Sequence, residues 1–222
     1  MILDVTNPEH VQGIVDQVTT TLQGTGLPLV ALVNNAGVAG LNVVEDTDMD
    51  RMRHLYDVNV FGLMDITRAL LPLLRSSRGR VVNIASVAGQ VAAPLMGIYS
   101  SSKFAVEGLT DALRREMHPH GVAVSIVEPG YVATPILHKP EVFDEALMKL
   151  YGAASWMEGM QRAASKASPV TVTTAAIKDA IVSPTPRERY PCANVDGFPV
   201  WVLLKVQWAL PTHVFDAIMV HF

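Results

Sequence analysis

Cysteine is nearly absent from this sequence, and other residue patterns that define whole classes of protein are missing as well. Cys192 is the single cysteine among 222 residues, which excludes a disulfide within the chain and is typical of a reducing compartment. The formal net charge is −4 and no run of lysine or arginine occurs, so we expect no nucleic-acid partner. The seven histidines lack the spacing of metal ligands, so we expect no metal site.

Apolar segments long enough to span a membrane are also missing. No run of 18 residues is both apolar and uncharged, and the first residues do not show the pattern of a secretory signal peptide. We therefore expect a cytoplasmic protein. The apolar C-terminal tail, residues 198–222, leaves an alternative open, because Trp201, Lys205 and Trp208 among apolar residues are typical of a membrane interface. The tail is expected either to form a lid or core packing, or to bind a membrane surface peripherally.

Short apolar runs alternate with helical patterns along the chain. The expected strands cover residues 29–33, 80–86, 122–128 and 189–193, after a strand end at 2–4; the expected helices cover 7–23, 48–75, 98–118, 140–168 and 171–182. The first helix is expected to use Thr6 as its N-cap in a capping box with Glu9. Uniformly apolar strands that alternate with helices are typical of a parallel sheet covered on both faces. The sequence therefore predicts an α/β fold, a doubly wound, Rossmann-like parallel sheet forming one domain over residues 1–222.

Tyr99 and Lys103 are four residues apart in an expected helix, so their side chains share one face. A neighbouring ammonium favours the phenolate, which predicts that the pKa of Tyr99 lies below its ordinary value of about 10. A phenol tuned in this way can act as a general acid or base near neutral pH. Most such pairs are ordinary helix surface, so this interpretation depends on further residues.

Polar and turn-forming residues follow three of the expected strands. They are Asn35, Ser86 and the pair Pro129-Gly130. The carboxyl ends of parallel strands meet at one edge of a sheet, and ligands bind beyond that edge. We therefore expect these residues to lie on one rim.

These motifs, in this order and at this spacing, resemble those of the short-chain dehydrogenase/reductase family. The matching features are N-N-A-G at 34–37, a helix asparagine at 59, a strand-end serine at 86, Y-x-x-x-K at 99–103 and P-G-x-x-x-T at 129–134. Three further runs, at 71–74, 79–83 and 113–116, are most similar to the branch that contains retinol and hydroxysteroid dehydrogenases. The resemblance covers essentially the whole chain.

The resemblance implies an NAD- or NADP-dependent oxidoreductase that interconverts a hydroxyl and a carbonyl by hydride transfer. Tyr99 would be the acid/base, Ser86 would hold the substrate oxygen, Lys103 would bind the nicotinamide ribose, and Asn59 would anchor a water that joins Lys103 to solvent. The implied cofactor contacts are Asp4, Val5, Asn35, Ala36, Gly37, Tyr99, Lys103, Pro129, Gly130, Val132 and Thr134. As a glycine, Gly37 would also allow a positive φ in a tight turn. The structural alternatives are a strand-end cap for Ser86, a satisfied polar kink for Asn59 and a simple turn residue for Asp4.

Residues 136–168 resemble the substrate loop of the family. Their apolar members are Leu137, Phe143, Leu147, Met148, Tyr151, Trp156, Met157 and Met160. A pocket lined by them would accept a small apolar hydroxyl or carbonyl compound such as a steroid, a retinoid or a long-chain alcohol; ordinary helix packing is the alternative. The helices at 48–75 and 98–118 resemble the pair through which family members dimerise, so a homodimer is expected.

The Gly-rich turn with which most members of the family begin, T-G-x-x-x-G-x-G, does not occur in the 222 residues. The segment 1–6 matches the end of the third strand of the family pattern instead. We therefore expect an N-terminally truncated fold, as in a fragment, that lacks most of the first βαβαβ half and leaves the strand at 29–33 as an exposed edge. The alternative is a catalytically inactive chain or a non-catalytic scaffold or binding protein of the same fold.

Overall fold

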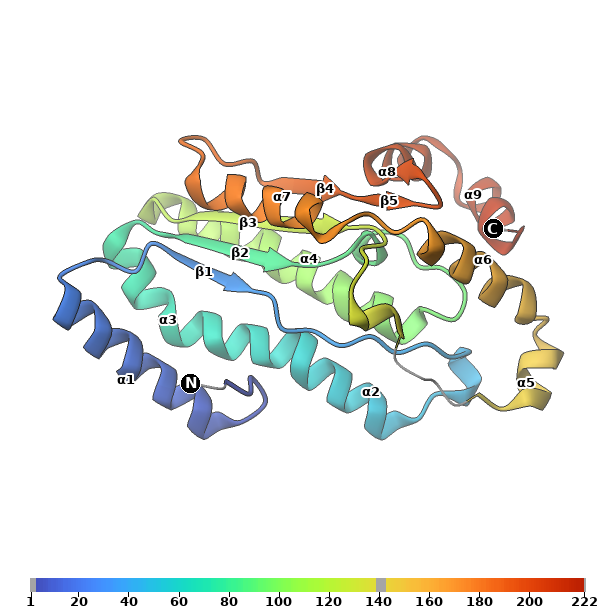
Figure 1. Cartoon of the computed structure of the whole chain (residues 1–222), viewed down its shortest axis with the longest axis horizontal. Coiled ribbons are helices and arrows are strands. Elements are labelled where there is room, and N and C mark those ends of the chain that lie inside the picture. The colour runs from blue at the N-terminus through green and yellow to red at the C-terminus, as the bar shows by residue number, and fades with distance from the viewer. Residues whose placement is uncertain (1–2, 139–142, 222) are drawn as a thin grey trace.

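Four parallel strands form the central sheet of the computed structural model, which describes residues 3–138 and 143–221. The strands are β1 (Ala31–Asn34), β2 (Arg80–Ile84), β3 (Ala123–Pro129) and β4 (Arg189–Cys192), and each pairs with the next in that order. Because all four run in the same direction, their carboxyl ends share one edge of the sheet (Figure 1). This edge is the rim that the sequence predicts.

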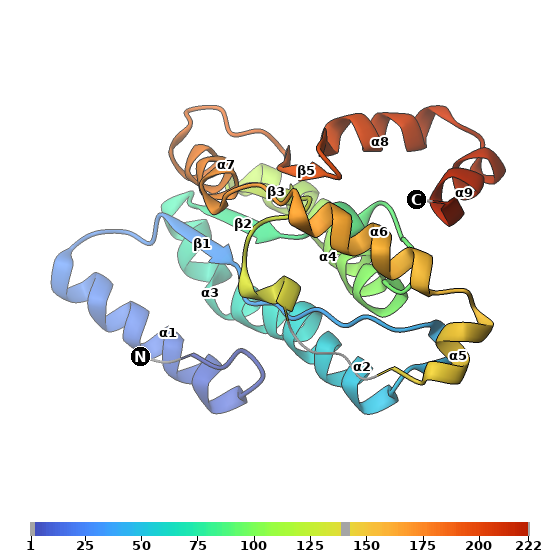
Figure 2. The same ribbon diagram turned by 45° about the vertical axis from the view of Figure 1, so that its right-hand side comes forward.

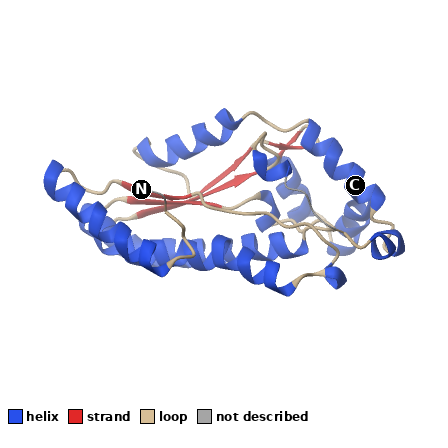
Figure 3. Ribbon diagram, turned by 60° about the horizontal axis from the view of Figure 1, so that its bottom comes forward, coloured by secondary structure: helices blue, strands red, loops and turns tan. Residues whose placement is uncertain are grey.

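Helices cover both faces of the sheet. On one face lie α3 (Leu63–Ser77) and α4 (Gly97–Met117), with α1 (Pro8–Thr25) packed beside α3 (Figure 2). On the other face lies α7 (Val170–Val182), so that the strands run between two layers of helices (Figure 3). The predicted doubly wound α/β fold is therefore confirmed.

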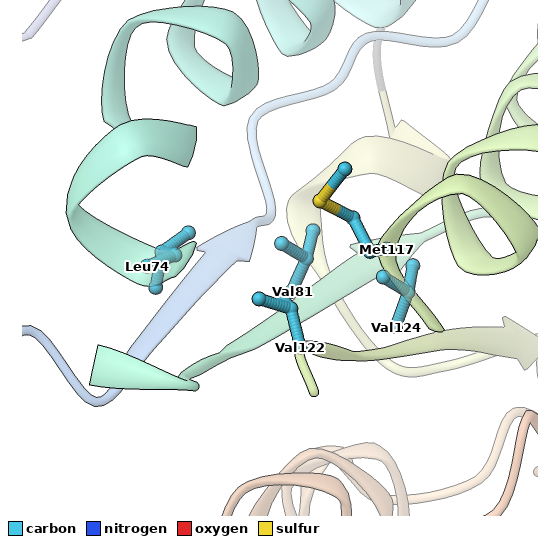
Figure 4. Close-up of a cluster of buried hydrophobic side chains, with 5 residues drawn as sticks. All are labelled: Leu74, Val81, Met117, Val122 and Val124. Atoms are coloured by element: carbon cyan, nitrogen blue, oxygen red, sulfur yellow. The ribbon is translucent and has the colours of Figure 1, made fainter. Parts of the chain in front are cut away.

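Apolar side chains fill the space between each helical layer and the sheet. Leu74 and Met117 of α3 and α4 meet Val81, Val122 and Val124 in one cluster, which Figure 4 shows. The cluster on the opposite face consists of Val82, Val127, Ala176, Ala180 and Tyr190. Burying a side chain of this size contributes about 1.5–3 kcal/mol, so these contacts hold the strand ends in place.

The β1 strand is an edge of the sheet among the described residues, where its partner is β2. Val30, directly before β1, is 63% exposed, and Leu27 is 66% exposed. An apolar edge with unpaired backbone groups invites pairing with another strand. The predicted exposed edge is confirmed.

The predicted helix at 48–75 consists of three segments. It begins as α2 (Met49–Tyr56), widens into a π-helical turn, η2 (Asp57–Gly62), and continues as α3. A π-helical turn inserts an extra residue and is frequent at functional sites. The turn explains how Asn59 reaches inward, and helical periodicity alone does not reveal it.

The predicted N-cap of the first helix is wrong by one residue. Asn7 caps α1, because its Oδ1 accepts hydrogen bonds from the backbone N–H groups of Glu9 at 2.9 Å and His10 at 3.4 Å. The Thr6 hydroxyl donates to Asp4 instead, at 2.7 Å. Residues 3 and 4 are not a strand end, and residues 1 and 2 lie outside the described part.

Helices α5, α6, α8 and α9 gather beyond the carboxyl ends of the strands (Figures 1 and 2). The predicted helical region 140–168 contains α5 (Glu145–Leu150) and α6 (Ala154–Ser165), separated at Gly152, whose φ is +60°. The C-terminal region forms β5 (Asn194–Val195), β6 (Phe198–Pro199), α8 (Val200–Ala209) and α9 (Thr212–His221). Short 3-10 turns are η1 (Val44–Asp46), η3 (Val87–Gly89), η4 (His118–His120) and η5 (Pro135–His138). Within the described residues, none of the helices has the length and apolar character needed to cross a bilayer.

Candidate active site

Ser86 stands immediately beyond β2 and joins two strand ends. Its hydroxyl donates to the carbonyl of Pro129 at the end of β3, with 3.3 Å between the oxygens, and accepts from the backbone N–H of Ala88 at 3.1 Å. The hydrogen bond from Ala88 also caps the η3 turn. The strand-end cap that was the structural alternative for Ser86 is therefore present. Ser86 therefore sits on the expected rim, in a fixed position.

Helix α4 brings Tyr99 and Lys103 to the same place. The phenol of Tyr99 lies near the Ser86 hydroxyl, which acts to lower the pKa of the phenol. The Lys103 ammonium lies 5.8 Å from the centre of the Tyr99 ring and donates to the carbonyl of Ile84, the last residue of β2, at 2.9 Å. Three residues that the sequence singles out thus form one contiguous group at the strand ends.

The pKa of Tyr99 is raised, so the predicted lowering is wrong. Burial of the phenol raises its pKa, and the nearby Ser86 hydroxyl opposes this effect. Burial also lowers the pKa of Lys103 to about 8, against the charge of Glu107, which raises it. Both shifts have the same origin, because a low-dielectric surrounding disfavours the charged form of either group. Near neutral pH the phenol keeps its proton and most of Lys103 is charged.

Asn59 ties the segment after β1 to α4. Its Oδ1 accepts from the N–H of Val38 at 2.8 Å, and its Nδ2 donates to the carbonyl of Val38 at 2.9 Å and to the Ser102 hydroxyl at 3.1 Å. The side chain is a buried polar group with every contact made through protein atoms, as the structural alternative anticipates. The water that Asn59 would anchor for Lys103 stays a prediction. Sequence reasoning missed Ser102, whose hydroxyl also donates to the carbonyl of Tyr99 at 2.8 Å.

The segment Asn35, Ala36 and Gly37 is exposed beside this group. Gly37 does not adopt the positive φ that a glycine allows. A Cβ at Gly37 would lie 3.4 Å from Asn59 Oδ1 and 3.7 Å from Lys103 Nζ, which is ordinary contact. Gly37 therefore faces the Lys103 ammonium directly, and the absence of a side chain leaves the approach to that ammonium open.

The Pro129-Gly130 break reaches the same rim through the contact of Pro129 with Ser86. A Cβ on Gly130 would lie 2.2 Å from the carbonyl oxygen of Asn194, so no other residue fits there without movement of the backbone. Beyond it, Val132 bridges to Ser168, and the Thr134 hydroxyl lies 3.4 Å from the carbonyl oxygen of Val132. Val132 and Thr134 are half-buried.

Asp4 and Val5 lie away from this group, against the π-helical turn. A Cβ at Gly62 would come within 2.7 Å of the Val5 side chain, so the two segments touch closely. The exposed Asp4 carboxylate accepts from the backbone and side chain of Thr6, and these bonds lower its pKa. Asp4 thus acts as a turn residue, which was the structural alternative for it. Among the described residues, no hydrogen bond joins Asp4 or Val5 to Tyr99 or Lys103.

A buried charged cluster behind the site escaped the sequence predictions. It consists of Glu107 on α4, Glu128 on β3 and Arg189 on β4. Glu107 is one helical turn beyond Lys103, and that spacing is the signal that could have identified it. The pairing itself joins residues far apart in sequence.

The donors present suit one end of a nicotinamide nucleotide. The Lys103 ammonium has three donors, one of which is bonded to Ile84, and the Tyr99 hydroxyl lies on the same side, a set that matches the vicinal hydroxyls of a ribose. A pyrophosphate is usually bound by the backbone of a Gly-rich turn at a helix N-terminus. The 222 residues contain no such turn after a strand. The residues present therefore fit the nicotinamide riboside end, but they provide no Gly-rich turn to bind the phosphates.

Comparisons with known proteins agree with this arrangement. The model of the short chain dehydrogenase family matches residues 1–142. Rat mitochondrial D-beta-hydroxybutyrate dehydrogenase is 34% identical over 235 residues, covering 99% of this chain and 68% of that protein, and mouse retinol dehydrogenase 5 is 37% identical over 234 residues, covering 98% and 71%. The chain thus spans about two thirds of the length of these relatives.

Two solved structures show the same fold. A short-chain dehydrogenase from Streptomyces avermitilis superposes with a TM-score of 0.74 at 29% identity, covering 98% of this chain and 74% of the other. A short-chain dehydrogenase/reductase from Burkholderia phymatum, in complex with NAD, superposes with a TM-score of 0.68 at 29% identity, covering 84% and 68%.

Proposed function

Because the chain belongs to the short-chain dehydrogenase family, we propose that it is an NAD- or NADP-dependent oxidoreductase that interconverts a hydroxyl and a carbonyl on an apolar substrate. The observation that carries the proposal is the Tyr99 phenol, which lies near Ser86 and beside the buried Lys103 at the strand ends.

The proposed chemistry follows from the protonation states. The substrate oxygen is held by the Ser86 hydroxyl and the Tyr99 phenol. Tyr99 keeps its proton because burial raises its pKa, so it can donate that proton to a carbonyl oxygen and become a phenolate; in the reverse direction the phenolate takes the proton of a hydroxyl. The Lys103 ammonium favours the phenolate that forms in passing. When bound, the nicotinamide supplies or accepts the hydride.

The cofactor contacts are proposed along the same rim. Tyr99 and Lys103 hold the nicotinamide ribose. The residues proposed for the nicotinamide ring and its carboxamide are Pro129, Gly130, Val132 and Thr134; those for the adenosine end are Asn35, Ala36 and Gly37 at the ribose and Asp4 and Val5 at the adenine. Asn59 is proposed to act through the water that it would anchor near Lys103.

Cofactor binding tests the proposal directly. The 222-residue chain is expected to bind NADH or NADPH weakly in a fluorescence titration, because it lacks a Gly-rich turn for the pyrophosphate. A chimera in which the N-terminal segment of a family member, with its Gly-rich turn, precedes Met1 should bind and turn over the cofactor. Lys103→Ala in the chimera should weaken binding, and the exposed Lys178→Ala should not. Tight binding by the 222-residue chain would contradict the expectation.

The substrate loop, residues 136–168, is proposed to line an apolar pocket. Its members Leu147, Met148, Trp156, Met157 and Met160 pack around Val43, Leu95 and Ala153. Part of their surface is therefore core, as the alternative anticipates. The Tyr151 hydroxyl instead donates to the exposed Glu45 at 2.7 Å, and Phe143 is half-buried. The side chain of Leu137 lies outside the described residues.

A homodimer through the helices at 48–75 and 98–118 is also proposed. Phe61 in η2 is 57% exposed and Phe104 in α4 is 45% exposed, and burial against a second copy would remove both from water. We expect a dimer by sedimentation at micromolar concentration and a shift toward monomer for Phe104→Glu. Val182→Glu, at an exposed position of α7, should leave the dimer intact. A wild-type protein that sediments as a monomer would exclude this interface.

The C-terminal tail is proposed to contact a membrane surface with its outer face. Its inner face packs as core, through Val200, Leu204 and Phe215. The outward side chains are Phe198, Trp201, Trp208, Ile218 and Val220, and the Lys205 ammonium lies 5.1 Å from the centre of the Trp201 ring. Tryptophan and lysine together suit the interfacial layer of a bilayer.

Flotation with liposomes tests the tail proposal. The wild-type protein is expected to float with liposomes that contain anionic lipid, and Trp208→Asp is expected to reduce the floating fraction, because Trp208 is 82% exposed and packs little within the protein. Val172→Asp, an exposed change on α7, is the matched control. Equal flotation of wild type and Trp208→Asp would leave the tail as a lid or core element.

A further inference from the structure

Two buried carboxylates face a single guanidinium directly behind the site. Glu107 on α4 is 7% exposed and Glu128 on β3 is 0% exposed. One nitrogen of Arg189, Nη1, lies 2.5 Å from Glu107 Oε2 and 2.8 Å from Glu128 Oε1. The other, Nη2, lies 3.0 Å from Asp111 Oδ1.

Among the described residues, Arg189 is the one cation within ion-pair distance of both carboxylates. Asp111 has two further cations, Arg114 at 2.6 Å and Arg115 at 3.8 Å, so Arg189 is the shared counter-charge of Glu107 and Glu128. Two buried like charges with one counter-ion cannot both ionise at low cost. Burial and the charge of Glu128 raise the pKa of Glu107 to about 7, and burial also raises the pKa of Glu128.

The hydrogen bonding indicates a proton between the two carboxyl groups. Glu107 Oε1 and Glu128 Oε2 are buried, and neither accepts a hydrogen bond from the other described residues when both groups are ionised. An unsatisfied buried oxygen costs free energy, whereas one proton lets Glu107 and Glu128 hydrogen-bond each other. The pair is therefore expected to take up a single proton as the pH falls through neutrality.

This pair lies against the segments that carry Lys103, Ser86 and Pro129. Glu107 is four residues beyond Lys103 on the same helix face, and its charge acts on the Lys103 ammonium. A Cβ at Gly89, in the turn that follows Ser86, would lie 3.0 Å from both Glu107 Cγ and the carbonyl oxygen of Lys103. The side chain of Gln90 donates to Glu128, which directly precedes Pro129.

We propose that Glu107 is a positioning residue for Lys103, and that it acts through a single proton shared with Glu128. The proposal rests on the proposed function of Lys103. With the shared proton bound, one negative charge remains next to Lys103 and keeps it charged inside the protein. When the shared proton leaves, a second negative charge is added and Lys103 holds its own proton more firmly.

The pair and the charged and titratable groups around it come from three elements. Glu107 lies on α4 and Glu128 on β3. The groups around them are Lys103, Asp111, Arg114 and Arg115 on α4, and Arg189 and Cys192 on β4. Arg189 favours ionisation of the pair, and Asp111 opposes it at Glu107. The Cys192 thiol has a pKa raised mainly by burial, so it stays neutral in this range.

The test is the titration of Lys103 in the full chain, followed by NMR of lysine labelled with ¹³C at Cε. No cofactor or turnover is needed, so the result is independent of the catalytic test on Tyr99. Glu107→Gln should lower the pKa of Lys103 by about one unit, since an opposite charge within about 4–6 Å is worth 1–3 units. Glu128→Gln should not lower it, because Glu107 then keeps its charge and Arg189.

Asp111→Asn is the matched control, since Asp111 contacts Arg189 but lies two helical turns from Lys103. It should leave the Lys103 titration unchanged. A merely structural role for Glu107 makes the opposite prediction: loosening the site would hydrate Lys103 and move its pKa up toward the ordinary value. A pKa in Glu107→Gln that is unchanged or higher than in the wild type would overturn the proposal.

A second measurement covers the case in which Glu107→Gln fails to fold. In wild-type protein labelled with ¹³C at the glutamate side chains, one buried carboxyl is expected to take up a proton as the pH falls through neutrality. If Glu107 and Glu128 both stay ionised down to about pH 5, near the ordinary range of a carboxyl, the shared proton does not exist and the proposal fails.

Discussion

Replacing Tyr99 with phenylalanine is expected to abolish turnover by the chimera that carries a Gly-rich turn, while the cofactor still binds. The ring keeps its packing, Ser86 can still hold the substrate oxygen, and Lys103 keeps its bond to Ile84. What is lost is the proton donor and acceptor, and removal of a positioned acid/base typically costs about 10²–10⁴-fold in rate. The measurement is the change in nicotinamide absorbance with time, beside a fluorescence titration of the cofactor.

Tyr56→Phe is the control for this experiment. Tyr56 lies at the end of α2, with its ring 6.4 Å from that of Phe61, and has no assigned part in the chemistry. Its loss of a hydroxyl should leave the rate near that of the unmodified protein. A Tyr99→Phe protein with the wild-type rate would remove Tyr99 from its proposed role, and with it the proposed mechanism.

Replacing Arg189 with methionine is expected to lower the free energy of unfolding by about 3 kcal/mol near neutral pH. Removing one partner of a buried ion pair leaves an uncompensated charge and costs about 3–5 kcal/mol; the lower end applies because the Arg189 side chain is 37% exposed. Unfolding in urea, followed by circular dichroism, gives the change. Arg68→Met, which breaks an exposed pair with Asp65 at 3.1 Å, should cost about 0–1 kcal/mol.

The loss in Arg189→Met should depend on pH with a defined sign. The folded-state pKa of Glu107, about 7, is above its unfolded value of 4.5, so its contribution to stability is fully present below 4.5 and is lost as the pH rises through 7. Without Arg189 the pKa rises further and this loss becomes larger. The variant should therefore approach wild-type stability on acidification. A loss of the same size at acidic and neutral pH would contradict the shared-charge description.

The sequence alone determines the strands, their common rim and the group formed by Ser86, Tyr99 and Lys103. These features depend on the local periodicity of apolar residues and on the rule that the carboxyl ends of parallel strands share one edge of the sheet. Runs such as Val81-Val82 are buried on both faces in any covered parallel sheet, and residues that follow parallel strands must share an edge. The spacing of four residues then places Lys103 beside Tyr99 on any helix.

The helix cap, the π-helical turn and the conformation at Gly37 depend on contacts that local sequence patterns do not predict. Asn7 caps α1 although Thr6 fits the motif, because the Thr6 hydroxyl is bonded to Asp4. The π-helical turn lets Asn59 reach the backbone of Val38, and Gly37 needs no positive φ because the chain passes it in an ordinary conformation.

Tertiary structure alone decided the electrostatics of the site. The direction of the Tyr99 pKa depends on what covers the phenol, and burial outweighs the neighbouring ammonium that the spacing emphasises. The charged cluster joins Arg189 to Glu107 and Glu128, which are 82 and 61 residues away in the chain. No periodicity encodes such a pairing, because it arises when β3 and β4 pair and α4 packs on them, and the energy of a buried charge depends on that finished surrounding.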